Sequence, residues 1–212
     1  MTNLIYVLGS GGHASVVVDI LLQNTPEPNI TIVGPKVNDL RKNLSQLRFI
    51  SDAELQSYNP SEVTLYNGVG SMPGTNLRQK LYRQYSDLGF KFSALISKQA
   101  FVSPNVNLSA GAQVLTGAIV NVGAEIGENS IINSGAIIEH DTQINSHSHI
   151  APGALICGDS IIGKNCHIGA GAKIIQNISI GNNCLVASGA IVTKNLENNQ
   201  ISYGYRSQVI NK

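Results

Sequence analysis

The feature that most constrains this chain is a six-residue repeat. From Ile96 to Val192, every sixth residue is Ile, Leu or Val without exception. Two positions before each of them stands a second column of mostly small side chains, which runs from Ala94 to Ala190. A period of six held this long fits neither an amphipathic helix nor an alternating strand. A fixed hexapeptide repeat predicts a parallel β-helix.

The repeat also predicts how the coil is built. Three hexapeptides make one triangular turn of three times six, or 18, residues, and successive turns stack about 4.8 Å apart. The branched column faces the interior, and the small column lies where a corner leaves little room. A third phase is rich in Gly and Asn, which tolerate the left-handed backbone of tight corners. Its members are Gly111, Gly117, Gly123, Gly135, Gly153, Gly171 and Gly189, with Asn105, Asn129, Asn165, Asn177 and Asn183.

Composition excludes several classes of protein. The net charge is +1, and no Lys/Arg cluster points to nucleic acid or to an anionic membrane surface. No apolar stretch reaches the length of a transmembrane helix, and the N-terminus lacks the basic start of a signal peptide. Cys157, Cys166 and Cys184 are odd in number and lie inside the repeat, which favours packing over disulfides or metal binding. We expect a reduced, cytoplasmic protein.

The first ninety residues follow a different pattern. We predict strands at Leu4–Leu8, Ile30–Val33 and Val63–Tyr66. We also predict a helix that follows His13 and runs through Leu22, and a second helix from about Thr75 to Leu88. Alternating strands and helices imply a small Rossmann-like α/β domain with a parallel sheet. The predicted organisation is an α/β domain over residues 1–92, an all-β left-handed parallel β-helix over residues 93–194, and a C-terminal tail over residues 195–212.

The glycine-rich turn after the first strand has three interpretations. Gly9-x-Gly11-x-x-Ala14 resembles a dinucleotide fingerprint, but the second strand ends in Gly34-Pro35 where an acidic ribose ligand would stand. The turn can also be purely structural. We favour a nucleotide or sugar-phosphate site, because such a turn gathers backbone N–H groups at a helix N-terminus. Its predicted substrate-binding residues are Gly11, Gly12, His13, Gly68, Gly70 and Ser71.

Histidines give the coil its candidate chemistry. His140 lies two residues after an inward Ile, near a corner, and a neutral imidazole can accept a proton near pH 7. Asp141 is our first choice and Glu139 our second for the carboxylate that orients the ring. A surface histidine in a turn is the alternative. Asn133 and His149 fall within the same coil, which strengthens the catalytic interpretation.

The 18-residue period adds two further expectations. Gly158 follows His140 by one full turn, where its N–H can donate to a developing oxyanion; a simple turn glycine is the alternative. His167 follows His149 by one turn on the same face. With His140, these two could supply zinc ligands across an interface. We expect no metal, because His140 lies half a coil from the other two.

Together, Gly-Ser-Gly-Gly-His, the α/β domain and a hexapeptide coil with Ile-Glu-His-Asp resemble one family over almost the whole chain. It is the family of bacterial sugar acetyltransferases with an N-terminal nucleotide-sugar-binding domain and a left-handed β-helix. Members N-acetylate nucleotide-linked amino-sugars, as in bacillosamine or perosamine synthesis, and a similar branch O-acetylates sialic or legionaminic acids. The resemblance implies acetyl-CoA as co-substrate and a homotrimer with the coenzyme between neighbouring coils.

The resemblance also implies residue roles. His140 would be the general base, Asp141 its partner and Gly158 the oxyanion donor. Asn133 would position substrate or base, and His149 would line the acetyl-CoA site; we add His167 to that cofactor group. Two departures stand out: Gly34-Pro35 replaces the Asp-Asp of UDP-sugar users, and Gly204-Tyr205-Arg206-Ser207-Gln208 replaces a Gly-x-Pro-Ala-Lys tail.

The expected function is therefore N-acetylation of a nucleotide-linked 4-amino-4,6-dideoxy sugar for a surface glycan. O-acetylation of a sialic- or legionaminic-type sugar acid is the alternative within the same class. A non-catalytic trimeric β-helix, acting as a scaffold or a nucleotide-sugar sensor, is the alternative from another class.

Overall fold

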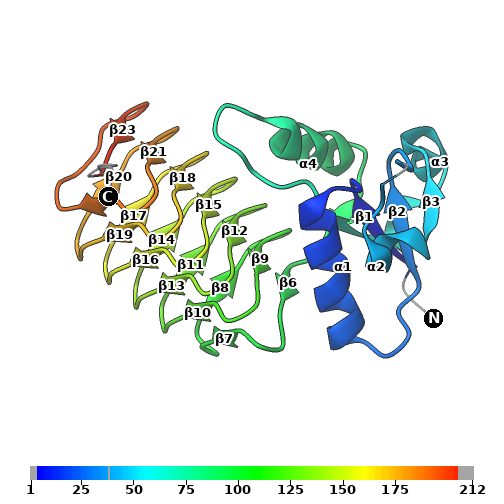
Figure 1. Ribbon diagram of the computed structural model, residues 1–212, viewed down its shortest axis with the longest axis horizontal. Helices are drawn as coiled ribbons and strands as arrows, with labels where there is room; N and C mark the ends of the chain where they lie inside the picture. Colours follow the sequence, from blue (N-terminus) through cyan, green and yellow to red (C-terminus); the bar gives the residue numbers. More distant parts are fainter. Residues whose placement is uncertain (1–3, 38, 205–212) are drawn as a thin grey trace, which may run out of the picture.

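The computed structural model describes residues 4–37 and 39–204. The chain forms an α/β domain followed by a three-sided coil of short parallel strands, and helices α1 and α4 lie where the two parts meet (Figure 1). Both predicted architectures, the Rossmann-like sheet and the β-helix, are confirmed.

The α/β domain is one parallel sheet in the order β3-β2-β1-β4-β5. Its strands are β1 (Leu4–Leu8), β2 (Ile30–Val33), β3 (Arg48–Ile50), β4 (Val63–Asn67) and β5 (Lys91–Phe92). Its helices are α1 (Gly12–Asn24), α2 (Lys42–Ser45), α3 (Asp52–Gln56) and α4 (Leu77–Asp87), with a 3₁₀ turn at Pro60–Glu62. The sequence analysis did not predict β3, β5, α2 or α3, which are too short to show a period.

The coil has three faces, each a stack of two-residue strands. The first face contains β6 (Leu95–Ile96), β9 (Gln113–Val114), β12 (Ile131–Ile132), β15 (His149–Ile150), β18 (His167–Ile168), β21 (Leu185–Val186) and β23 (Ile201–Ser202). The second contains β7 (Phe101–Val102), β10 (Ile119–Val120), β13 (Ile137–Ile138), β16 (Leu155–Ile156), β19 (Lys173–Ile174) and β22 (Ile191–Val192). The third contains β8 (Asn107–Leu108), β11 (Glu125–Ile126), β14 (Gln143–Ile144), β17 (Ile161–Ile162) and β20 (Ser179–Ile180).

The branched column forms the core of the coil, as predicted. Val114, Ile132 and Ile150 are fully buried, whereas Ile96 in the first turn is 38% exposed because no coil lies beneath it. The predicted glycine corners have a positive φ, but Asn105 is not among the positive-φ residues. The same phase also forces the left-handed conformation on Asp141, with φ 56°.

Two of the cysteines belong to the small-residue column. Cys166 and Cys184 are buried free thiols that follow Ser148 at successive turns of one corner. The Ser148 hydroxyl donates to the Gly163 carbonyl at 2.7 Å, and the Cys166 thiol donates to the Gly181 carbonyl at 3.0 Å. These cysteines therefore pack and hydrogen-bond as the serine does.

The coil continues into the segment that the sequence analysis separated as a C-terminal tail, residues 195–212. Leu196 bridges Ile180, and β23 pairs with β21, so the stack runs at least to Ser202. Of the Gly204–Gln208 departure, only Gly204 lies within the described residues.

Candidate active site

Two glycine loops and the first face of the coil enclose one cavity of about 640 Å³. It is lined by Gly9–His13, Pro35, Gly68–Met72, Leu77, Ile131 and His149. The two loops meet because β1 and β4 are neighbouring parallel strands that end side by side, with Leu8 opposite Asn67. All six residues predicted in these loops therefore lie around the same cavity.

Steric limits explain two of the glycines. Gly9 has φ 88°, a left-handed conformation that favours glycine. Gly68 lies against the end of β1, and a Cβ there would come within 2.6 Å of the Leu8 carbonyl oxygen. The two loops can therefore approach each other this closely only because positions 9 and 68 carry no side chain.

The α1 end of the cavity is suited to an anion. Helix α1 has Gly11 as its N-cap, no side-chain cap and no acidic residue in its first turn. The Arg41 guanidinium covers Gly12, whose added Cβ would lie 3.1 Å from Nη2. Free N–H groups, the positive end of the helix dipole and a guanidinium thus meet at one place.

His13 joins this cavity to the coil. Its Nε2 lies 2.7 Å from Gln113 Oε1, and Gln113 Nε2 donates to the Asn67 carbonyl at 2.9 Å. Burial, aided by the charge of Arg78, lowers the pKa of His13 to about 4, so its ring is neutral at pH 7. The sequence analysis missed Gln113, although it stands 18 residues before Ile131 and 36 before His149 in the outward column of the first face.

His149 forms part of the cavity wall beneath the second loop. The Asn133 amide donates to His149 Nε2 at 2.9 Å, and His149 Nδ1 donates to the Ser71 carbonyl at 3.1 Å. Burial and the neighbouring His167 lower the pKa of His149 to about 3. Both ring nitrogens are engaged, so His149 has no lone pair for a metal. Its predicted cofactor role stays a prediction.

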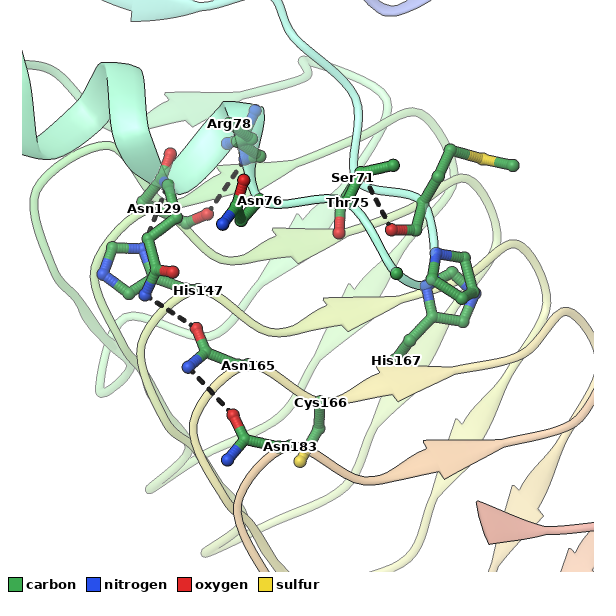
Figure 2. A pocket seen from close by; sticks show the side chains of 14 residues that line it. Ser71, Thr75, Asn76, Arg78, Asn129, His147, Asn165, Cys166, His167 and Asn183 are labelled. Atoms are coloured by element: carbon green, nitrogen blue, oxygen red, sulfur yellow. Dashed lines mark hydrogen bonds between the residues drawn. The ribbon is translucent and has the colours of Figure 1, made fainter. Parts of the chain in front are cut away.

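His167 lies on the other side of the second loop, in a separate cavity of about 310 Å³ (Figure 2). Its ring meets His149 edge-on, with centroids 4.9 Å apart, and its buried Nδ1 has no hydrogen-bond partner among the described residues. Burial lowers the pKa of His167. This cavity is lined by Ser71–Asn76, Arg78, Gln79, Asn129, His147, Asn165–His167 and Asn183.

A second group of predicted residues lies at the corner that follows β13. His140 Nδ1 is 2.9 Å from Asp141 Oδ2, and both side chains are more than half exposed. The hydrogen bond with Asp141 is the main cause that raises the pKa of His140 above its usual value. Glu139 instead accepts a hydrogen bond from Asn121 at 2.9 Å, so the choice of Asp141 as the orienting carboxylate fits the observed contacts.

Glycines make room for this pair on the adjacent turns. A Cβ on Gly123 would clash with the Asp141 carboxylate, and a Cβ on Gly158 would lie 2.6 Å from both Cε1 and Nε2 of His140. Because Nδ1 faces Asp141, Nε2 is the nitrogen left to act as a base. The 18-residue spacing correctly predicted that Gly158 lies against His140.

The structure does not bring all the predicted site residues together on one face. His140, Asp141 and Gly158 follow strands of the second face, whereas the loop cavity and His149 lie over the first face. Asn133 lies at the corner between these two faces, bound to His149. No cluster of three or more metal-ligating side chains occurs within residues 4–37 and 39–204.

Comparison with known proteins agrees with this architecture. Residues 123–158 and 159–194 match the bacterial transferase hexapeptide family (six repeats). The acetyltransferase domain of PglB from Neisseria gonorrhoeae, solved with acetyl coenzyme A, is 25% identical, with 96% of this chain and 97% of that chain covered and a TM-score of 0.87. A histidine variant of perosamine N-acetyltransferase from Caulobacter crescentus, solved with CoA and GDP-perosamine, is 26% identical over 100% and 99%, with a TM-score of 0.84.

WeeI from Acinetobacter baumannii has the same fold at 21% identity, with a TM-score of 0.80 over 92% of this chain and 93% of that one. The chain therefore carries the bacterial transferase hexapeptide repeat, and its fold is similar over almost the whole length to those of solved sugar acetyltransferases. It is an acyltransferase enzyme. None of the helices in the described part of the chain has the length and apolar character needed to cross a membrane.

Proposed function

We propose that this protein transfers an acetyl group from acetyl-CoA to the amino group of a nucleotide-linked amino-sugar. The observation that carries the proposal is the corner where Asp141 holds His140 Nδ1 at 2.9 Å and the Gly158 backbone lies against the opposite edge of the ring. This arrangement provides a base and a backbone N–H at one place, as direct acyl transfer requires.

In the proposed reaction, His140 Nε2 removes a proton from the sugar amine as it attacks the thioester carbon. Asp141 keeps the proton of the neutral ring on Nδ1 and stabilises the charged imidazolium. The Gly158 N–H donates to the thioester oxygen as negative charge develops there. His140 then returns the proton to the departing thiolate. No nucleophilic residue is needed, and the thiols of Cys166 and Cys184 are engaged in hydrogen bonds to backbone carbonyls.

The loop cavity is the proposed site of the nucleotide part of the substrate. Gly11, Gly12 and Arg41 offer positive charge and free N–H groups to a diphosphate, and His13 and Ser71 lie deeper in the same cavity. The two relatives at 25–26% identity were solved with acetyl coenzyme A or with CoA and GDP-perosamine. We propose a 4-amino-4,6-dideoxy sugar destined for a surface glycan, and we keep His149 and His167 as candidate contacts of acetyl-CoA.

A homotrimer would bring the two groups of residues together. The outward column of the second face is almost wholly apolar, and its member Ile137 lies just before the corner that carries His140. It consists of Phe101, Ile119, Ile137, Leu155, Lys173 and Ile191, of which Phe101 is 57% and Ile191 64% exposed. We propose that neighbouring coils bury this stripe, so that His140 of one chain faces the loop cavity of the next.

Light scattering of an Ile137→Glu variant tests the assembly. A charge in the middle of the stripe should dissociate the trimer and abolish turnover, because neither group of residues is complete without the other chain. An active monomer would contradict the shared site. Gln143→Glu, on the polar third face, is the matched control and should remain trimeric.

The activity itself is tested by thiol release from acetyl-CoA. The acceptors are UDP-linked 4-amino-4,6-dideoxy sugars, GDP-perosamine, and sialic and legionaminic acids, with His140→Ala as control. Turnover on a nucleotide amino-sugar that is lost in the variant supports the proposal. Turnover on free sugar acids alone would replace it with O-acetylation, and no turnover on any acceptor would favour a scaffold or sensor.

A further inference from the structure

We propose that Arg78 is a positioning and selectivity residue for the substrate cavity. It fixes the Asn67–Ser71 loop to the coil and places an uncompensated positive charge behind the loop, which favours a substrate carrying a diphosphate. This inference rests on the proposed use of a nucleotide-linked substrate and deepens it.

The contacts of Arg78 are all backbone carbonyls. Its Nη1 donates to the Asn67 carbonyl at 2.9 Å and to the Val69 carbonyl at 2.7 Å, and its Nε donates to the Asn129 carbonyl of the coil at 3.1 Å. The guanidinium therefore joins three segments: helix α4, the loop that follows β4, and the corner before β12. Figure 2 shows Arg78 at this junction, beside Asn129 and Asn76.

The charge of this guanidinium has no counter-ion. The Arg78 side chain is only 5% exposed, and its Nη2 is buried without a hydrogen-bond partner among the described residues. Within that same part of the chain, the ion pairs are Arg48–Glu54 and His140–Asp141, so no described carboxylate pairs with Arg78. A buried, unpaired cation is costly, which implies that it serves something other than stability.

The same loop is held from several sides. Its carbonyls at residues 67, 69 and 71 are bound by Arg78, by Gln113 and by His149. The Val69 N–H is bound by the Asn67 side chain at 3.1 Å. Every second carbonyl is therefore held by a side chain of the coil or of helix α4, and Gly68 and Gly70 line the cavity. A loop fixed in this way does not need to be ordered by the substrate.

Arg78 lies directly behind the cavity wall, because its Nη1 donates at 2.7 Å to the carbonyl of Val69, a residue that lines the cavity. In agreement, its charge contributes to the lowered pKa of His13 and of His149, although burial is the main cause for both. Both rings are neutral at pH 7, whereas Arg78 stays charged there, because burial lowers its pKa only to about 9. An anion in the cavity would supply the counter-charge that no described carboxylate gives Arg78, and Arg41 adds a second guanidinium beside Gly12 at the α1 end.

Calorimetric titration of UDP, GDP and pyrophosphate into the full-length protein tests the proposal. Arg78→Met removes the charge and the donors, and we expect the Kd of the nucleoside diphosphate that binds to rise about tenfold, or ~1.4 kcal/mol. Arg78→Lys keeps the charge and some donors, so its Kd should stay within about threefold of the wild type. In turnover assays, the loss should be mainly in KM for the nucleotide-sugar and only slightly in kcat.

Arg83→Met is the matched control, because Arg83 is an exposed residue of the same helix and its loss changes the net charge equally. Its Kd should stay within about twofold of the wild type. Equal affinities in the wild type and in Arg78→Met would overturn the proposed role of Arg78 but leave the proposed nucleotide site standing. A wild type that binds none of the three anions would overturn the proposed nucleotide site as well. If Arg78→Met does not fold, Arg78→Lys alone can test the proposal, because it keeps the charge. A loss of affinity of about tenfold in Arg78→Lys would show that the charge is not what the ligand needs.

Discussion

The corner at His140 and the cavity wall at His149 place the same side chain in opposite surroundings. His140 is more than half exposed and bound to a carboxylate, which raises its pKa. His149 is 8% exposed and bound to an amide and a carbonyl, and its pKa is lowered to about 3. Of the two, only His140 can change its protonation state near neutral pH.

The two histidines also differ in how far away their partners lie in the sequence. His140 is bound by the next residue and stacked on Gly158 one turn later, so its surroundings follow the period of the coil. His149 is bound to Ser71, 78 residues earlier, in a loop of the other domain. The difference suggests that His140 transfers a proton, whereas His149 fixes the position of the loop at Ser71.

The largest effect is expected at His140. Replacement by Ala should lower kcat by about 10²–10⁴, because it removes the proposed general base. The unfolding midpoint should hardly change, since the ring is exposed. Steady-state kinetics on the trimer measure this. Unchanged turnover would remove His140 from the mechanism and with it the contrast between the two histidines.

Gly158→Ala should have the next largest effect. Its Cβ would lie 2.6 Å from the His140 ring, so the ring must move away from the Gly158 N–H. We expect a loss of about 10²–10³ in kcat, similar to the loss of an oxyanion donor. The control is Gln176→Ala, one turn further at the same corner and exposed. Equal activity of the two variants would show that the 158 backbone is not part of the site.

Asp141→Asn should change the pH dependence. The base must be neutral, so kcat/KM in the wild type falls as the pH decreases through the raised pKa of His140. Without the carboxylate that pKa decreases, and the acid limb should move to lower pH while the plateau rate drops by about tenfold through loss of orientation. An acid limb that stays in place would mean that another group titrates.

The smallest catalytic effect is expected at His149. His149→Phe leaves the Ser71 carbonyl and the Asn133 amide without partners, which should lower the free energy of unfolding by about 1–3 kcal/mol. KM for the nucleotide-sugar should rise more than kcat falls. His167→Phe is the stability control, because the buried Nδ1 of His167 makes no hydrogen bond to any residue that the structure describes. A large loss of kcat with unchanged stability would instead give His149 a direct catalytic role.

Predictability from sequence follows the same division between periodic and long-range contacts. The inward column, the corner glycines and the stacking of Gly158 on His140 all follow from the 18-residue turn. Gln113 could have been recognised as a polar residue in the outward column of the first face. Arg78 could not, because it lies on an amphipathic helix where an Arg usually faces solvent.

The sequence by itself determined the coil, the order of its faces and the corner that carries His140, because a strict repeat converts position in the chain directly into position in space. Tertiary structure alone decided that His149 holds the loop at Ser71. It alone also buried Arg78 away from every carboxylate in the described part of the chain. These contacts depend on side-chain direction and on the docking of one domain against another, which no local pattern encodes.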